Sequence, residues 1–148
     1  VYKIRDVYNF EKYDTRTSPG LNCWAWFQLL MILIFTSYLF GNIAHINKLD
    51  PYYIFMYGGF IFLSVYALTE LMDRNPLAIF WECMRSAFGL TILFVQDDWF
   101  GASAYLTSIK WTLAVYFLFS MTLTGWFAIK HKHEDQAILM RGQEFSGQ

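Results

Sequence analysis

Charge is what this sequence has least of. Only 16% of its 148 residues are Asp, Glu, Lys or Arg, whereas soluble domains devote about a quarter of their residues to charge. The net charge of −1 argues against a nucleic-acid partner, because phosphate binding needs a clustered positive surface. Hydrophobic residues make up 56% of the chain and aromatic residues 21%. A chain this short is expected to form one domain, and this composition predicts a membrane domain.

Residues that carry chemistry are also scarce. Cys23 and Cys83 lie in apolar runs without metal-type spacing and are expected to be plain buried residues. His45 falls in a predicted loop on one side of the membrane, whereas His131 and His133 follow the last span on the other. The sequence has no Gly-x-Ser-x-Gly elbow and no Gly-rich phosphate loop. It therefore predicts no catalytic residue, metal ligand or cofactor in this chain.

Long runs without charge are what the sequence does have. Residues 51–69 and 111–129 each form a run of 19 uncharged residues, and a longer one separates Arg16 from Lys48. Nineteen residues give a helix of roughly 28 Å, close to the hydrocarbon thickness of a bilayer. We predict spans at about 21–40, 52–71, 77–95 and 109–129. The expected fold is all-α and integral to the membrane, a bundle of four transmembrane helices.

The third span is less regular than the others, because Glu82 and Arg85 interrupt it. We expect it to begin at Pro76 or just after, since proline suits the first turn of a helix. Its first two turns would then lie in the headgroup zone or in a region lined by protein.

Polar segments flank the four-span domain, which we place at 21–130. Residues 1–20 are expected to form a cytoplasmic strap that ends in a turn at Pro19 and Gly20. Residues 131–148 are expected to form a polar tail. The first residue is Val, and no secretory signal precedes the first span. We therefore expect a processed protein or a fragment of a longer one.

The distribution of Lys and Arg predicts the orientation. Four spans put both termini and the second loop on one side, and that side would hold most of the basic residues. They are Lys3, Arg5, Lys12, Arg16, Arg74, Arg85, Lys130, Lys132 and Arg141. The opposite side would hold only Lys48 and Lys110. The positive-inside rule then predicts a multi-pass protein with cytoplasmic N- and C-termini.

A charged hairpin, residues 70–85, separates the second span from the third. Its ionisable residues are Glu70, Asp73, Arg74, Glu82 and Arg85. Charge at membrane depth is costly, so each group needs a partner, water or a function. The spacings of Glu70 with Arg74 and of Glu82 with Arg85 put each pair on one helix face. We expect mutual neutralisation at the helix ends; the alternative is contact with a lipid headgroup or with a neighbouring catalytic domain.

Two further sets of residues carry expectations about packing. The uncharged polar residues within the spans are expected to form ordinary interhelical hydrogen bonds: Gln28, Thr36, Ser64, Ser120, Thr122 and Thr124. Five tryptophans near span ends are expected to form an aromatic belt at the membrane interfaces: Trp24, Trp26, Trp99, Trp111 and Trp126.

Two stretches carry a resemblance to a known family: VYNFEKYDTRTSPGLN before the first span and LMDRNPLAIFWECMR between the second and third. They are similar to the C-terminal membrane region of alkylglycerol-monooxygenase-like members of the sterol desaturase / fatty acid hydroxylase superfamily. The matching positions of the hairpin are Leu71, Asp73, Pro76, Glu82 and Arg85. The resemblance runs from about Tyr8 to Val95. It implies a parent that is an O2-dependent di-iron lipid hydroxylase, desaturase or monooxygenase, in some members with tetrahydropterin as reductant.

The sequence departs from that family in one respect. The family's di-iron site needs about eight clustered histidines, and none of those clusters occurs in this chain. The catalytic part would lie upstream or on another chain, and this chain alone would be non-catalytic, with roles in anchoring and lipid access. Its partners would be membrane lipid and that catalytic domain. The alternative is a small accessory or structural subunit, without enzymatic activity, that packs against neighbouring membrane subunits.

Overall fold

The computed structural model describes the backbone of residues 18–146, with side chains as far as residue 130 except residue 128. Every regular element in that range is a helix. The α-helices are α1 (Pro19–Leu49), α2 (Tyr52–Met72), α3 (Ala78–Val95) and α4 (Ile109–Ser146), and a short 3₁₀ helix, η1 (Ala102–Ala104), precedes α4. The predicted all-α class is confirmed. Most of the predicted strap, up to residue 17, and the side chains of the predicted tail lie outside the described residues.

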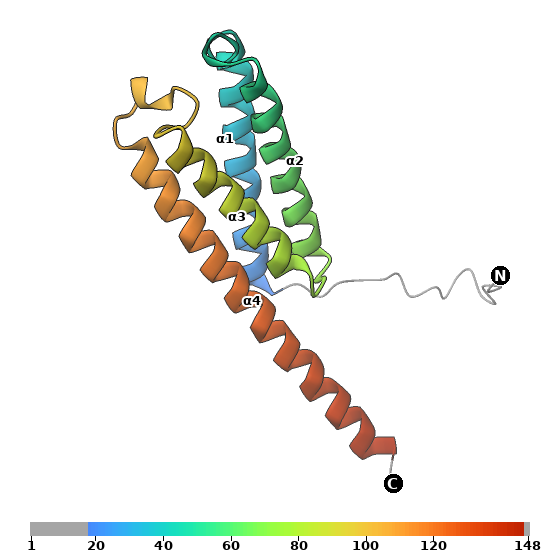
Figure 1. Cartoon of the computed structure of the whole chain (residues 1–148). Coiled ribbons are helices and arrows are strands. Elements are labelled where there is room, and N and C mark those ends of the chain that lie inside the picture. Colours follow the sequence, from blue (N-terminus) through green and yellow to red (C-terminus); the bar gives the residue numbers. More distant parts are fainter. Residues whose placement is uncertain (1–17, 147–148) are drawn as a thin grey trace, which may run out of the picture.

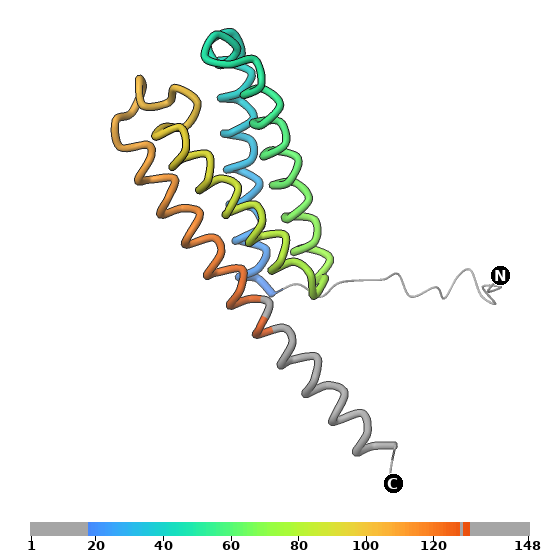
Figure 2. Tube along the Cα trace, viewed as in Figure 1, coloured from blue at the N-terminus to red at the C-terminus, as the bar shows by residue number. Residues whose placement is uncertain are grey.

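The helices pack in chain order, α1 against α2, α2 against α3 and α3 against α4. Figures 1 and 2 show them running alternately up and down, so that the start of α1 and the α2–α3 turn share one end. Among the described residues, α1, α2 and α3 are long and apolar enough to cross a membrane. They support the prediction of a multi-pass membrane protein.

The first helix is longer at both ends than the sequence indicated. Pro19 and Gly20 form its first turn instead of a turn before it, and the Ser18 side chain caps the helix by accepting a hydrogen bond from the Leu21 N–H at 3.3 Å. At its other end α1 includes residues 41–49, where a loop was expected. Helical hydrogen bonding continues through that stretch as far as Asp50, whose N–H donates to the Ile46 carbonyl. The next residue, Pro51, has no N–H to donate, and the helix ends there.

The turn between α2 and α3 delays the start of the third helix. Arg74 has a positive φ of 54°, which reverses the chain after α2. The Asn75 side chain then accepts a hydrogen bond from the Leu77 N–H at 2.9 Å. Pro76 belongs to this turn instead of the first turn of the helix, and α3 begins at Ala78, one residue after the start of the predicted span at 77.

The loop between α3 and α4 folds back into the bundle. Trp99 and Phe100 are buried among the helices, at 2% and 0% exposure. The Asp98 carboxylate holds the loop by accepting hydrogen bonds from the backbone N–H of Trp99 and of Ser103. Gly101 has a φ of +87°, and a Cβ there would lie 2.6 Å from His45 Nε2. The loop is therefore a packed cap over one end of the helices.

The aromatic belt is only partly as expected. Trp26, Trp111 and Trp126 are exposed, as residues of a belt would be. Trp24 and Trp99 are buried, because each indole N–H has a hydrogen-bond acceptor inside the protein.

Two apolar regions fill the interior. The larger one, which we call the aromatic core, is built around Phe35, Tyr57, Phe60, Trp99 and Phe117, whose rings contact one another. A smaller cluster at the opposite end contains Leu21, Trp24, Leu71, Ala78 and Phe127. Between the two lies a set of buried polar side chains.

Candidate functional site

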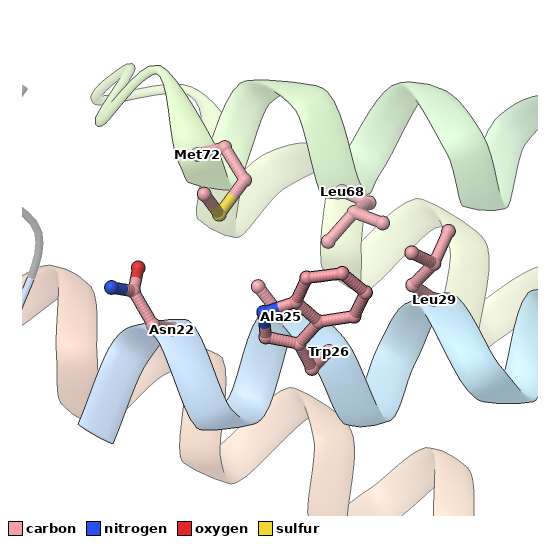
Figure 3. Close-up of a pocket in the computed structure, with 6 residues that line it drawn as sticks. All are labelled: Asn22, Ala25, Trp26, Leu29, Leu68 and Met72. Carbon is pink, nitrogen blue, oxygen red and sulfur yellow. The ribbon is translucent and has the colours of Figure 1, made fainter. Parts of the chain in front are cut away.

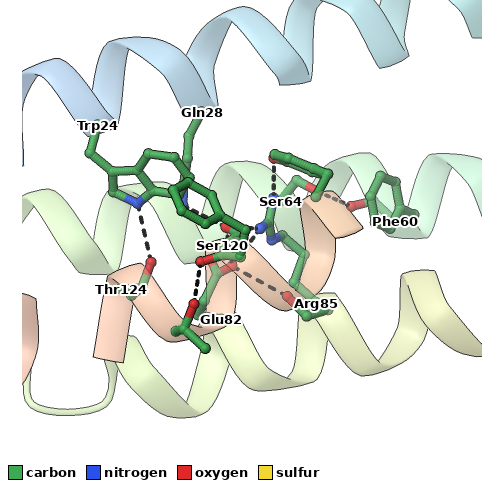
Figure 4. A network of polar contacts seen from close by, with 12 residues as sticks. Trp24, Gln28, Phe60, Ser64, Glu82, Arg85, Ser120 and Thr124 are labelled. Atoms are coloured by element: carbon green, nitrogen blue, oxygen red, sulfur yellow. Dashed lines mark hydrogen bonds and ion pairs between the residues drawn. The ribbon is translucent and has the colours of Figure 1, made fainter. Parts of the chain in front are cut away.

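Glu82 and Arg85 lie on the inner face of α3, each with 1% of its surface exposed. They form an ion pair one helical turn apart, as their spacing predicted. Figure 4 shows them near Ser120 of α4, within a network of polar contacts between the helices. Protein thus surrounds these two side chains at the start of the third span.

Ser120 of α4 is the centre of the cluster. Its hydroxyl oxygen accepts hydrogen bonds from Arg85 Nη2 at 2.6 Å and from Gln28 Nε2 at 3.2 Å. The hydroxyl lies 2.6 Å from Glu82 Oε1, to which it donates its proton. A serine hydroxyl has one proton and two lone pairs. All the hydrogen-bonding capacity of Ser120 is therefore used inside the protein.

The Arg85 guanidinium is held by α4 as well as by Glu82. Its Nη1 donates to the Tyr116 hydroxyl at 3.0 Å, and its central carbon lies 5.5 Å from the centre of that ring. The same carbon lies 6.0 Å from the centre of the Phe117 ring, which belongs to the aromatic core. Arg85 Nε is buried and has no hydrogen-bond partner among the described residues. The cation is thus solvated by one carboxylate, two hydroxyls and two aromatic rings.

The first helix joins the same cluster. Gln28 binds Ser120, and the Trp24 indole N–H donates to the Thr124 hydroxyl at 3.2 Å. Both contacts connect α1 with α4, which are far apart in the chain. We call Trp24, Gln28, Glu82, Arg85, Ser86, Tyr116, Ser120 and Thr124 the polar layer.

The expected interhelical bonds are found for half of the polar residues within the spans. Gln28, Ser120 and Thr124 bond between helices. The other three hydroxyls bond to carbonyls of their own helix: those of Thr36, Ser64 and Thr122. Sequence reasoning did not single out Tyr116, since a tyrosine in an aromatic-rich span carries no signal that it faces a cation.

The remaining charges of the hairpin lie outside the polar layer. Asp73 caps the end of α2 and is exposed. Glu70 and Arg74 are half-buried near the same turn. The five charged residues of the hairpin therefore divide into a buried pair and a group around the α2–α3 turn.

A metal centre does not fit the described residues. No three His, Cys, Asp or Glu side chains among them are grouped closely enough to hold an ion. The one buried carboxylate of the polar layer, Glu82, is already engaged by Arg85, Ser86 and Ser120. The cysteines were expected to be buried, but Cys23 is exposed and Cys83 is half-buried.

An apolar pocket opens between α1 and α2. It is lined by Asn22, Ala25, Trp26, Leu29, Leu68 and Met72, and Figure 3 shows these side chains facing the space between the two helices. These residues come from the beginning of α1 and the end of α2. The pocket therefore lies at the same end of the bundle as the α2–α3 turn.

Comparison of this chain with protein-family models, with curated proteins and with solved structures gives no match.

Proposed function

We propose that this chain is the C-terminal membrane domain of a sterol-desaturase-like di-iron lipid oxidoreductase, with roles in anchoring and in lipid access. The polar layer is the observation that carries the proposal. Glu82 and Arg85 belong to the sequence motif that resembles the family, and their side chains bond to Ser120 of α4, which in turn accepts a hydrogen bond from Gln28 of α1. A motif used for internal packing suits a domain that supports a catalytic domain instead of performing the reaction.

The proposed topology has four spans, with α4 crossing as well, and cytoplasmic termini. Lys48 and Lys110 lie near one end of the bundle, while Arg74 and Lys130 lie near the other. The described side chains thus include basic residues at both ends of the bundle. The excess of Lys and Arg that the positive-inside rule uses comes from residues 1–17 and 131–148. The positive-inside rule puts the end with more Lys and Arg in the cytoplasm.

Lipid access is proposed for the pocket between α1 and α2. In this topology the pocket faces the cytoplasmic leaflet, and its wall is almost entirely apolar. An acyl chain could lie against Leu29 and Leu68 while Asn22 faces the headgroup region. The described residues offer no metal site, so any oxidation would take place in the catalytic domain.

Metal analysis of the full-length protein that contains this chain tests the proposal. We expect about two iron atoms per polypeptide in protein purified from membranes. The matched control is the same protein with one histidine of a cluster upstream of Val1 replaced by alanine. A full-length protein without iron and without clustered histidines would overturn the assignment to this family.

The second candidate is an accessory subunit without enzymatic activity. The exposed apolar side chains of α1 favour it, since Trp26, Leu30, Leu33 and Phe40 are each more than half exposed among the described residues. Such a surface suits burial against other membrane subunits as well as lipid. Purification in a mild detergent distinguishes the candidates: a stable complex with a different membrane polypeptide supports the subunit, and a single polypeptide supports the oxidoreductase.

A further inference from the structure

We propose that α3 depends on α4 to take up its membrane-spanning position, because α4 supplies the solvation of the Glu82–Arg85 pair. This inference concerns how the domain is assembled, and it rests on the proposed four-span topology. Its test separates failure of the topology from failure of the inference.

The first step is the position of the charges within α3. Arg85 is seven residues after the first residue of α3, which places it roughly 10 Å along the helix axis. The helix has 18 residues, and about 20 are needed to span the hydrocarbon core. A helix this short cannot slide out of the membrane to expose Arg85 without losing its span at the other end. The pair must therefore be accommodated at depth.

The second step is the source of the bonds. Within α3, Glu82 accepts from Arg85 and from Ser86, whose hydroxyl is 3.3 Å away. The contacts of Arg85 other than Glu82 come from α4: the hydroxyls of Tyr116 and Ser120 and the ring of Phe117. Polar groups in lipid are less costly when they find such partners, and α4 provides most of those of Arg85.

The third step is the closeness of the two helices. Gly89 of α3 lies against the Phe117 ring, so near that a Cβ on it would be 2.5 Å from the ring. Glycine permits close approach of helices in membranes. This contact is one turn beyond Arg85 and sets α4 against the face that carries the pair. We infer that α3 and α4 enter the membrane as one hairpin.

The experiment measures which side of the membrane the α3–α4 loop reaches. Ala104 in that loop is exposed, so Ala104→Cys gives a labelling site once Cys23→Ala and Cys83→Ala have removed the native thiols. Intact cells are treated with a membrane-impermeant maleimide, and labelling is divided by that obtained after permeabilisation. The background variant carries only these three substitutions, and its ratio tests the topology itself. A low ratio would mean that the loop is not exposed on the outside of the cell, and it would overturn the topology.

The test variant carries Tyr116→Phe and Ser120→Ala, which remove both α4 hydroxyls from Arg85. We expect the labelling ratio to fall at least twofold. In a fraction of the molecules α3 would then fail to cross the membrane, and the α3–α4 loop would stay on the cytoplasmic side. The matched control carries Thr112→Val and Thr122→Val, which remove two α4 hydroxyls that bond locally, to the carbonyls of Ser108 just before α4 and of Phe119 within it. Its ratio should equal that of the background.

A charge-free background separates solvation from packing. With Glu82→Leu and Arg85→Met in place, the Tyr116→Phe and Ser120→Ala substitutions should no longer change the ratio. The inference is overturned if the α4 substitutions leave labelling unchanged in the native background. It is also overturned if their effect persists after the charges have been removed.

Discussion

The two interior regions of this bundle, the polar layer and the aromatic core, are stabilised in different ways. In the polar layer a few groups depend on one another, and Ser120 alone contacts Glu82, Arg85 and Gln28. In the aromatic core many rings share the contacts, and Phe60 alone meets Phe35, Tyr57, Trp99 and Phe117. We therefore expect that loss of one member of the Glu82–Arg85 pair is severe unless the other is removed too. In the aromatic core, the cost of a substitution should follow the change in side-chain volume and the buried hydrogen bonds that it removes.

The largest effect is expected from Arg85→Ala. The substitution leaves the Glu82 carboxylate buried without its cation, and breaking a buried pair in this way costs about 3–5 kcal/mol. Unfolding in mixed micelles, followed by circular dichroism, measures the loss. Arg85→Met together with Glu82→Leu should recover most of it, since neither charge is then left alone. A double variant as unstable as Arg85→Ala would mean that the two residues do not act as a pair.

The next effect is expected from Gly89→Ala. A Cβ at this position would lie 2.5 Å from the Phe117 ring, and overpacking of this kind costs about 1–3 kcal/mol. The matched control is Gly58→Ala, where nothing lies within 4 Å of the added carbon. That variant should be neutral or slightly more stable, because alanine favours the helix. Equal unfolding midpoints for the two variants would contradict the close packing of α3 on α4.

A smaller effect is expected from Tyr57→Phe in the aromatic core. The Tyr57 hydroxyl donates to the Phe35 carbonyl at 3.0 Å and accepts from the Trp99 indole N–H at 3.1 Å. Its removal leaves a buried donor unsatisfied, at a cost of about 1–3 kcal/mol. Adding Trp99→Phe should recover part of the loss, because the orphaned N–H is then absent. A larger red shift of tryptophan fluorescence in Tyr57→Phe than in Tyr57→Phe with Trp99→Phe would report loosening of the cap around Trp99.

The smallest effect is expected from Thr124→Val, which removes the acceptor of the Trp24 indole N–H. Interhelical hydrogen bonds in membranes average about 0.6 kcal/mol, so the midpoint should move only slightly. Thr122→Val is the matched control, since that hydroxyl bonds within its own helix and faces outward. A loss as large as that of Arg85→Ala would mean that the α1–α4 contact belongs to the ionic cluster.

Much of the helical framework could be predicted from the sequence, because a spanning helix has to be free of charge over most of its length. The spans predicted at 52–71 and 77–95 coincide closely with α2 and α3. The ends of α1 were misjudged, and α4 continues as a helix to Ser146, beyond the predicted end of its span at 129. The predicted loop at 41–50 contains polar residues, yet such residues do not end a helix unless the backbone bonding is stopped, as it is at Asp50 and Pro51.

The interior was less predictable. The Glu82–Arg85 pair followed from spacing along one helix, but its burial and its partners on α4 depend on how two helices are rotated against each other. No local pattern records that rotation. Trp99 was expected at the membrane interface, and its burial depends on the backbone of the loop, where Asp97, Phe100 and Gly101 have positive φ values.

The Ser120 hydroxyl uses its one proton and both lone pairs inside the protein, and this has a consequence for how the sequence can evolve. A side chain that must donate once, accept twice and fit between three helices can be replaced by very few others. Chains that keep an acid and an arginine three residues apart on this helix should therefore keep a small hydroxyl residue 35 positions after the arginine. Chains that lose the charged pair should be free to place an alanine or a larger apolar residue there. That paired pattern of retention and loss would mark relatives even where the rest of the sequence has diverged.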